Sequence, residues 1–196
     1  MPVMTIVLPI LLILLFSLAY AAGAGAPWVP TFKHDIERVR RLLDVKDGET
    51  FVELGCGDGR VVFGVAGEGG RPKAERREGR RESKSLSASD PSRLRPLFIG
   101  VELSLIQWLV SQIRRMVTRT WNTRFVLGNL FSHNLRDADA VYFFLLPETY
   151  EKLRPKLEAE LRPGTRVVSA VWPVVGWTPE KIDEADGASK MYLYVR

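Results

Sequence analysis

The chain has 196 residues, with 28 Lys and Arg against 23 Asp and Glu and a net charge of +5. This length suits one domain, and the single cysteine, Cys56, excludes an intrachain disulfide and a cysteine-based zinc site. Two distant histidines give no reason to expect a metal. Nine of the basic residues lie in 71–95, so the positive charge belongs mainly to one segment and gives little support to nucleic-acid binding.

The first apolar run, residues 3–22, contains no charged side chain. About 20 helical residues span the bilayer core of about 30 Å. We therefore expect a single-pass transmembrane anchor with a flexible exit over residues 1–25. The basic residues that follow it predict a cytoplasmic catalytic domain by the positive-inside tendency. A cleaved signal peptide ending near Ala19-Tyr-Ala21 is the alternative, although no basic residue precedes the run.

The second helical pattern, residues 32–43, places Ile36, Val39, Leu42 and Leu43 on one face. A strand follows over residues 51–54, because Phe51, Val52 and Leu54 are strand formers. A glycine-rich turn then leads into a third helix over residues 60–66.

That turn reads Glu53-Leu-Gly-Cys-Gly-Asp-Gly59. Glycines lack Cβ, so a ligand can lie against bare backbone, and the helix behind presents free N–H groups. Dinucleotide sites use G-x-G-x-x-G/A, whereas here Arg60 takes the place of the last small residue. The pattern resembles motif I of class I S-adenosylmethionine methyltransferases, in which a carboxylate such as Glu53 can approach the cationic methionine end. A dinucleotide site and a turn without a ligand remain the alternatives.

Residues 67–96 are rich in Gly, Arg, Glu and Ser and have no apolar periodicity, so we expect a disordered basic insertion. The strand at 97–102 ends in Glu102. An acid at this place accepts hydrogen bonds from ribose hydroxyls about 20 residues after the glycines. Glu102 lies 43 positions after Gly59 (102 − 59), and the insertion accounts for the surplus.

The middle of the chain continues the alternation of helices and strands. Residues 104–119 predict a helix, with a core-facing side made of Leu105, Trp108, Leu109, Ile113, Met116 and Val117. A short strand is expected at 123–127. It is followed by Asn129, where S-adenosylmethionine enzymes commonly carry an Asp or Asn that meets the adenine amino group. Turn chemistry is the alternative interpretation of Asn129.

The last elements begin with an apolar strand over 139–147, in which Phe143, Phe144 and Leu145 can wall a pocket. A helix at 148–161 and a strand at 165–171 follow, and residues 172–177 and 191–195 are expected to form a closing antiparallel pair. These elements predict an α/β fold over residues 26–196. Its Rossmann-like sheet is mostly parallel with an antiparallel C-terminal strand, and helices cover both faces.

Several stretches together resemble one family of class I methyltransferases. It contains archaeal broad-specificity protein-lysine methyltransferases and the membrane-anchored mitochondrial enzymes that methylate lysines of ATP synthase subunit c and the adenine nucleotide translocase. The resemblance runs from residue 26 to the C-terminus, apart from the insertion. The stretches that carry it are Pro27-Trp-Val-Pro-Thr31, the glycine turn through Arg60, Leu161-Arg-Pro-Gly-Thr-Arg-Val-Val-Ser169, Gly176-Trp-Thr-Pro179 and Tyr192-Leu-Tyr-Val195.

The resemblance implies S-adenosylmethionine as the cofactor and no metal. It also implies that residues 29–31 close over the methionine end of the cofactor. One departure concerns the acceptor side, because Ala170-Val-Trp172 follows Val-Val-Ser169 where the family commonly carries a polar or charged residue. The candidate cofactor-binding residues are Pro30, Thr31, Glu53, Gly55, Cys56, Gly57, Asp58, Gly59, Glu102, Asn129, Leu130 and Phe143.

The function implied is that of a protein-lysine N-methyltransferase acting on a membrane-associated protein, and we expect a monomer. Glu148, just after the fourth predicted strand, is the candidate to orient the acceptor amine. Methylation of a small molecule, lipid or quinone is one alternative. A catalytically silent membrane adaptor is another, and the intact turn with Glu53 and Glu102 argues against it.

Overall fold

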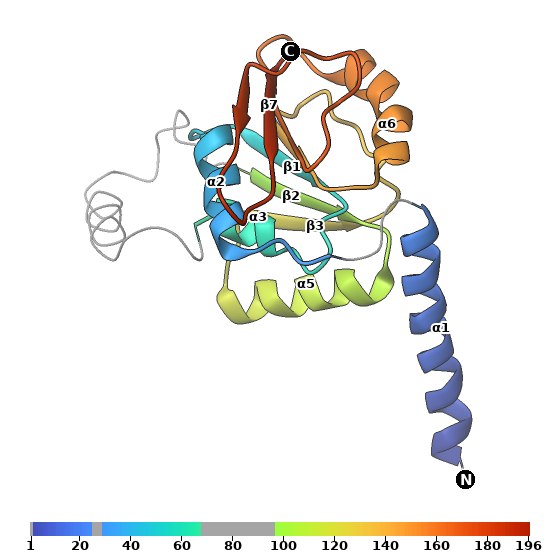
Figure 1. Ribbon diagram of the computed structural model, residues 1–196. Helices are drawn as coiled ribbons and strands as arrows, with labels where there is room; N and C mark the ends of the chain where they lie inside the picture. Colours follow the sequence, from blue (N-terminus) through green and yellow to red (C-terminus); the bar gives the residue numbers. More distant parts are fainter. Residues whose placement is uncertain (1, 25–28, 68–96) are drawn as a thin grey trace, which may run out of the picture.

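The computed structural model describes residues 2–24, 29–67 and 97–196. Its centre is a seven-stranded sheet in the order β3-β2-β1-β4-β5-β7-β6 (Figure 1). The first five strands in this order are parallel, and β7 runs antiparallel to β5 and β6, which confirms the predicted sheet. The strands are β1 Thr50–Leu54, β2 Leu97–Glu102, β3 Thr123–Leu127, β4 Ala140–Phe143, β5 Arg166–Ala170, β6 Lys181–Asp183 and β7 Met191–Val195.

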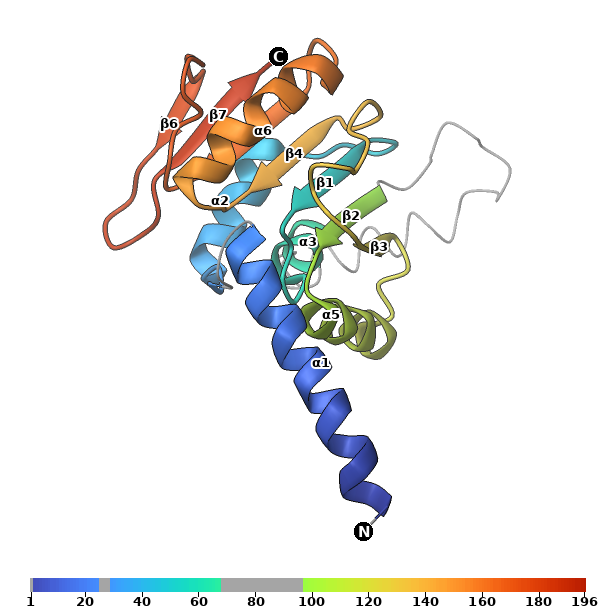
Figure 2. The same ribbon diagram turned by 90° about the vertical axis from the view of Figure 1, so that its right-hand side faces the viewer.

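Helices cover both faces of this sheet, as predicted (Figure 2). The helices on the sheet are α2 Lys33–Leu43, α3 Arg60–Val65, α5 Leu105–Thr118 and α6 Pro147–Glu160, whereas α1 Pro2–Ala24 extends away from the sheet and contacts α5 (Figure 1). Successive side chains of a strand point to opposite faces. Phe51 therefore packs into the core under α2 and α3, whereas Val52 and Leu54 pack into the core under α6.

Two local predictions are wrong. Residues 172–177 are not a strand, since Pro173 lacks an N–H donor and the Val174 N–H donates instead to the Tyr194 hydroxyl at 2.9 Å. β6 pairs with β7 in their place. The expected core-facing side of α5 is also largely uncovered by the described residues, with Leu109, Ile113, Met116 and Val117 all exposed.

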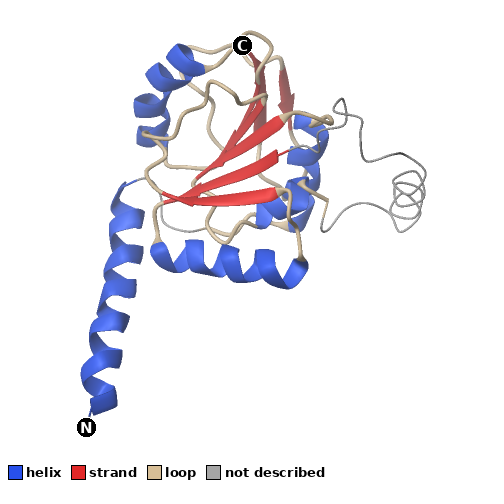
Figure 3. Cartoon of the chain, turned by 180° about the vertical axis from the view of Figure 1, so that it is seen from behind, coloured by secondary structure: helices blue, strands red, loops and turns tan. Residues whose placement is uncertain are grey.

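The predicted transmembrane anchor is contradicted as well. Across residues 2–24, 29–67 and 97–196, no helix combines the length and the apolar content that crossing a membrane requires. This finding overturns both the anchor over residues 1–25 and the single-pass localisation with a cytoplasmic domain. α1 instead meets the start of α5, where the Leu105 N–H donates to Ser17 Oγ at 2.8 Å (Figure 3). The predicted disordered insertion lies, except for Gly67, outside the described residues.

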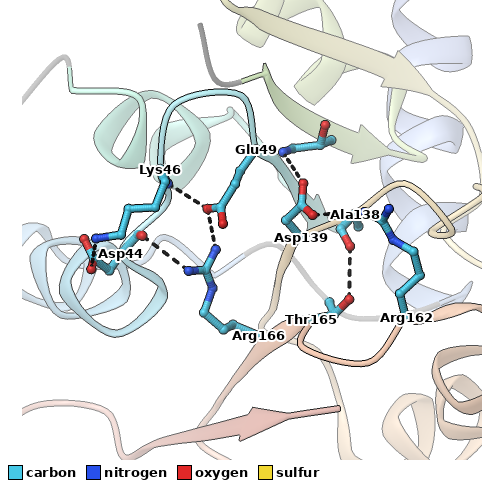
Figure 4. Close-up of polar contacts among 9 residues, drawn as sticks. Asp44, Lys46, Glu49, Ala138, Asp139, Arg162, Thr165 and Arg166 are labelled. Atoms are coloured by element: carbon cyan, nitrogen blue, oxygen red, sulfur yellow. Dashed lines mark hydrogen bonds and ion pairs between the residues drawn. The ribbon is translucent and has the colours of Figure 1, made fainter. Parts of the chain in front are cut away.

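Polar contacts tie together the edge of the sheet where the parallel strands begin (Figure 4). Asp139 Oδ2 accepts from the Thr50 N–H at 2.8 Å, and Asp139 Oδ1 accepts from Arg162 Nη2 at 2.9 Å. Glu49 accepts from both Arg166 and the Lys46 N–H. These contacts join the starts of β1, β4 and β5, so the opposite edge, where those strands end, is left to bind ligands.

Candidate functional site

The glycine turn leaves β1 at the point where the strand order of the sheet reverses, between β2 and β4. Open α/β sheets bind ligands outside the carboxyl ends of their strands at such a point. Gly55, Gly57 and Gly59 have φ values of 79°, 53° and 75°, which residues with a Cβ rarely adopt. The N–H groups of Gly55 and Cys56 both donate to Val101 O, at 2.9 and 3.0 Å, so the turn is fastened to β2.

Glu102 joins this turn to the loop after β2. Its Oε2 accepts from the Gly57 N–H and its Oε1 from the Ser104 N–H, both at 2.7 Å. Burial raises the pKa of Glu102, and the N–H groups of Ser104 and Gly57 oppose that rise. A carboxylate has about four acceptor sites, so Glu102 keeps acceptor capacity for a ligand hydroxyl beyond its backbone contacts.

Glu53 lies beneath the turn, where it is almost fully buried. Its Oε2 accepts from the Val62 N–H at 3.1 Å, near the start of α3. Burial raises its pKa well above the usual range, and the charges of Asp58 and Glu102 add to the rise. A cationic ligand group would favour the ionised form of Glu53, because an opposite charge offsets the cost of burial.

Cys56 and Gly59 have packing roles in addition to any ligand contact. A Cβ on Gly100 would lie 2.6 Å from Cys56 Sγ, and a Cβ on Gly59 would lie 2.5 Å from the Phe125 ring. The side chain of Cys56 therefore points into the core, and only its backbone faces the turn. The Asp58 carboxylate accepts hydrogen bonds from Arg60 Nε at 2.9 Å and from Arg60 Nη2 at 2.8 Å. This pair closes the turn on its outer side.

The remaining predicted site residues spread over three places. Asn129 is exposed, and its Oδ1 accepts from the Phe131 N–H at 2.9 Å, while neighbouring Leu130 is buried. Phe143 is fully buried and meets the Tyr150 ring edge-on under α6, with the ring centroids 4.9 Å apart. Glu148 is exposed in the first turn of α6. None of these side chains lines the pocket described next.

A pocket of about 80 Å³ lies where β4 and β5 end, and the segment of residues 29–32 forms part of its lining. Predicted Pro30 and Thr31 line it, and so does Phe144 just after β4. The pocket also contains two residues that the sequence did not single out, Asp35 of α2 and Tyr142 of β4. Asp35 has one sequence signal, because it shares a stripe of α2 with Arg38 and Leu42, both buried.

These residues fit S-adenosylmethionine, the cofactor that the resemblance implies. The turn offers bare backbone, Glu102 keeps acceptor capacity, and Glu53 offers a carboxylate to a cation. The buried Ser104 Oγ next to Glu102 has no hydrogen-bond partner among the described residues, so a polar ligand atom there would satisfy it. The chain would thus hold the ribose at Glu102 and the cationic end near Glu53.

Comparison with known proteins also supports a methyltransferase that uses S-adenosylmethionine. The ANTKMT methyltransferase domain family matches residues 53–181. A protein-lysine N-methyltransferase of Saccharolobus islandicus (strain REY15A) is 31% identical over 174 residues, which cover 86% of this chain and 92% of that protein. The mouse adenine nucleotide translocase lysine N-methyltransferase is 30% identical over 171 residues, and the match covers 86% of this chain but only 62% of the mouse enzyme.

A solved structure also resembles the whole fold. It is an RNA methyltransferase from Salinibacter ruber in complex with S-adenosyl-L-homocysteine, with a TM-score of 0.67 and 25% identity. The likeness covers 85% of this chain and 93% of that one. These proteins thus differ in the acceptors that their names give.

Proposed function

Because the chain belongs to the ANTKMT methyltransferase domain family, we propose that it methylates lysine side chains of a protein substrate. It is an S-adenosylmethionine-dependent methyltransferase of the protein-lysine N-methyltransferase family. The proposal adds the acceptor, which the relatives' names suggest. Since one relative acts on the adenine nucleotide translocase, we extend the proposal to a membrane-associated protein.

One observation supports the cofactor site most strongly, namely the link from the Gly57 N–H to Glu102. It holds the bare backbone of the turn and a strand-end carboxylate together before any ligand arrives. Such preorganisation lowers the cost of binding. Gly57 lies in the turn after β1 and Glu102 at the end of β2, so the link is a property of the fold and does not follow from the turn alone.

The reaction requires a neutral lysine, because an ammonium has no lone pair. S-adenosylmethionine, when bound, supplies an activated methyl group on a cationic sulfur. The protein has to position the acceptor, and proximity and orientation contribute about 7–11 kcal/mol in well-oriented reactions. An apolar pocket wall such as Phe144 and Met191 favours the uncharged amine and so lowers the lysine pKa.

The acceptor can be identified with S-adenosylmethionine labelled in its methyl group. The full chain is incubated with protein, RNA and lipid fractions of a cell extract, and the protein fraction is then hydrolysed to amino acids. We expect the label in methylated lysine, and no label with the Glu102→Ala variant. Label confined to RNA, to lipid or to another amino acid would contradict the lysine proposal.

A further inference from the structure

We infer that the pocket formed by residues 29–32, Asp35, Tyr142 and Phe144 receives the amine of the acceptor lysine, with Asp35 and Tyr142 as its hydrogen-bond partners. The inference rests on the proposed function and deepens it. The pocket volume of about 80 Å³ is well below the roughly 300–1,000 Å³ of sites for whole small molecules. A single extended side chain is therefore a better match than an entire cofactor.

Two buried polar atoms on the pocket lining lack partners. Asp35 and Tyr142 are each 1% exposed, and Asp35 Oδ2 and the Tyr142 hydroxyl have no hydrogen-bond partner within 3.5 Å among the described residues, although the Thr31 side chain lies near the hydroxyl. Unpaired buried polar atoms are rare because they cost folding free energy, so a ligand atom that hydrogen-bonds to them would be stabilising. Both groups line the same pocket. Burial is the main cause of the raised pKa of Tyr142 and the charge of Glu53 the second; a hydrogen bond with the Thr31 side chain opposes the rise, and Tyr150 and Asp35 add the smallest contributions.

Arg38 holds Asp35 in this position. Arg38 Nη1 donates to Asp35 Oδ1 at 2.8 Å and to Ser189 O at 2.6 Å. Its Nε donates to Asp183 Oδ2 at 2.7 Å, and its Nη2 to Asp183 O at 2.6 Å. This fork occupies Oδ1 of Asp35 and leaves the buried Oδ2 without a partner among the described residues, while it fastens the β6–β7 loop to α2.

The free atoms suit a primary amine. A neutral amine has two N–H donors and one lone pair, so donation to Asp35 Oδ2 and to the Tyr142 hydroxyl leaves the lone pair for the incoming methyl group. A carboxylate alone would favour the ammonium, but the ion pair with Arg38 offsets the charge of Asp35. The rest of the lining is mainly apolar and includes Pro30, Phe144 and Met191, which fits the four-carbon stem of lysine. Val29 and Phe32 are exposed at the rim, whereas Asp35 and Tyr142 form a buried floor.

The α-ammonium of the cofactor's methionine is the other amine within reach of this region. It carries a carboxylate next to it, and none of the described residues that line the pocket is a Lys or Arg that could meet one. That carboxylate would instead lie near the charge of Asp35. An alkylamine without a carboxylate avoids this repulsion, so the lining favours lysine.

The test uses n-butylamine, which has the stem and amine of lysine, and n-butanol, which lacks the amine. Each is titrated into the full chain saturated with S-adenosylhomocysteine, and binding is followed by NMR. The signals of the Tyr142 ring report binding in the parent and in Asp35→Asn. In Tyr142→Phe the backbone amides of residues 29–35 report it instead. We expect n-butylamine to bind the parent and to bind Asp35→Asn and Tyr142→Phe at least about tenfold more weakly, since hydrogen bonds to charged groups are strong. S-adenosylhomocysteine affinity should stay unchanged in both variants.

Tyr194→Phe is the matched control, because it removes another buried tyrosine hydroxyl away from the pocket. Equal binding of n-butanol and n-butylamine would overturn the inference. So would a loss of S-adenosylhomocysteine affinity in both variants with n-butylamine binding intact, which would assign the pocket to the cofactor. If Asp35→Asn does not fold, Tyr142→Phe decides alone, since it removes only an unpartnered hydroxyl.

Kinetics separate this inference from the proposed function. With the labelled protein acceptor, Asp35→Asn and Tyr142→Phe should raise the KM for the acceptor and leave the KM for S-adenosylmethionine unchanged. Methylated lysine formed equally well by both variants would refute the pocket assignment and leave the proposed function standing. Failure of the parent to methylate any lysine would instead refute the proposed function.

Discussion

Glu53 shows how a single residue can trade stability for ligand binding. Burial raises its pKa in the folded state above the unfolded value of about 4.3. Between those two pKa values the folded state binds more protons than the unfolded state. The contribution of Glu53 to the free energy of unfolding is therefore fully present below the unfolded pKa and is lost as the pH rises through the folded pKa.

Glu53→Gln should consequently stabilise the ligand-free protein at neutral pH. The amide oxygen can still accept from the Val62 N–H, and no charge remains buried. Each 1 kcal/mol gained would raise Tm by about 2–4 °C for a chain of this size. The same variant should bind S-adenosylmethionine more weakly. Thermal unfolding between pH 4 and pH 8 checks the first expectation, with the half-exposed Glu37→Gln as control. A lower Tm at neutral pH would contradict this account of Glu53.

At the scale of elements, α2 and the β6–β7 loop are joined through Arg38. Arg38→Met would leave Asp35 and Asp183 without their buried partner, and removal of one member of a buried ion pair costs about 3–5 kcal/mol. Arg40→Met on the same helix removes only a surface pair with Glu37, which is worth less than about 1 kcal/mol. Urea unfolding of both variants measures the difference. Equal losses would mean that Arg38 does not fasten the loop.

The elements also show what could be predicted from the sequence. The glycine turn, the strand before it and the strand that ends in Glu102 were predicted correctly, because each depends on local patterns. β6 was missed, since a three-residue strand has no periodicity and forms only by pairing with β7. The apolar stripe of α5 was correctly located but wrongly assigned to the core. Amphipathicity defines a face and does not say what covers it.

The candidate site follows the same division. Asp35 and Tyr142 come together from α2 and β4, and Arg38 reaches Asp183 across 145 positions. No local sequence pattern predicts contacts between residues so far apart in the chain. Phe143 and Phe144 were both expected to wall a pocket, because an apolar strand does not show which face each side chain takes. The alternation of faces sends Phe143 under α6 and leaves Phe144 at the pocket.

At the scale of the whole molecule, residues where the parallel strands begin contribute to stability, and residues where those strands end are expected to bind the cofactor. Asp139 joins the starts of β1 and β4 at the edge shown in Figure 4 and lies away from the glycine turn. Asp139→Ala should lower the free energy of unfolding by about 1–3 kcal/mol, because the Thr50 N–H and Arg162 lose their acceptor. The affinity for S-adenosylhomocysteine should not change. A calorimetric titration that found weaker binding would show the edges to be coupled.

The central claim is that the carboxyl ends of β1 and β2 hold S-adenosylmethionine. Calorimetric titration of S-adenosylmethionine into the full chain, alongside Gly57→Arg and Glu102→Ala, tests it most directly. Binding by the parent that is abolished or much weakened in both variants is the predicted result. A folded parent that does not bind, or two variants that bind as tightly as the parent, would contradict the claim.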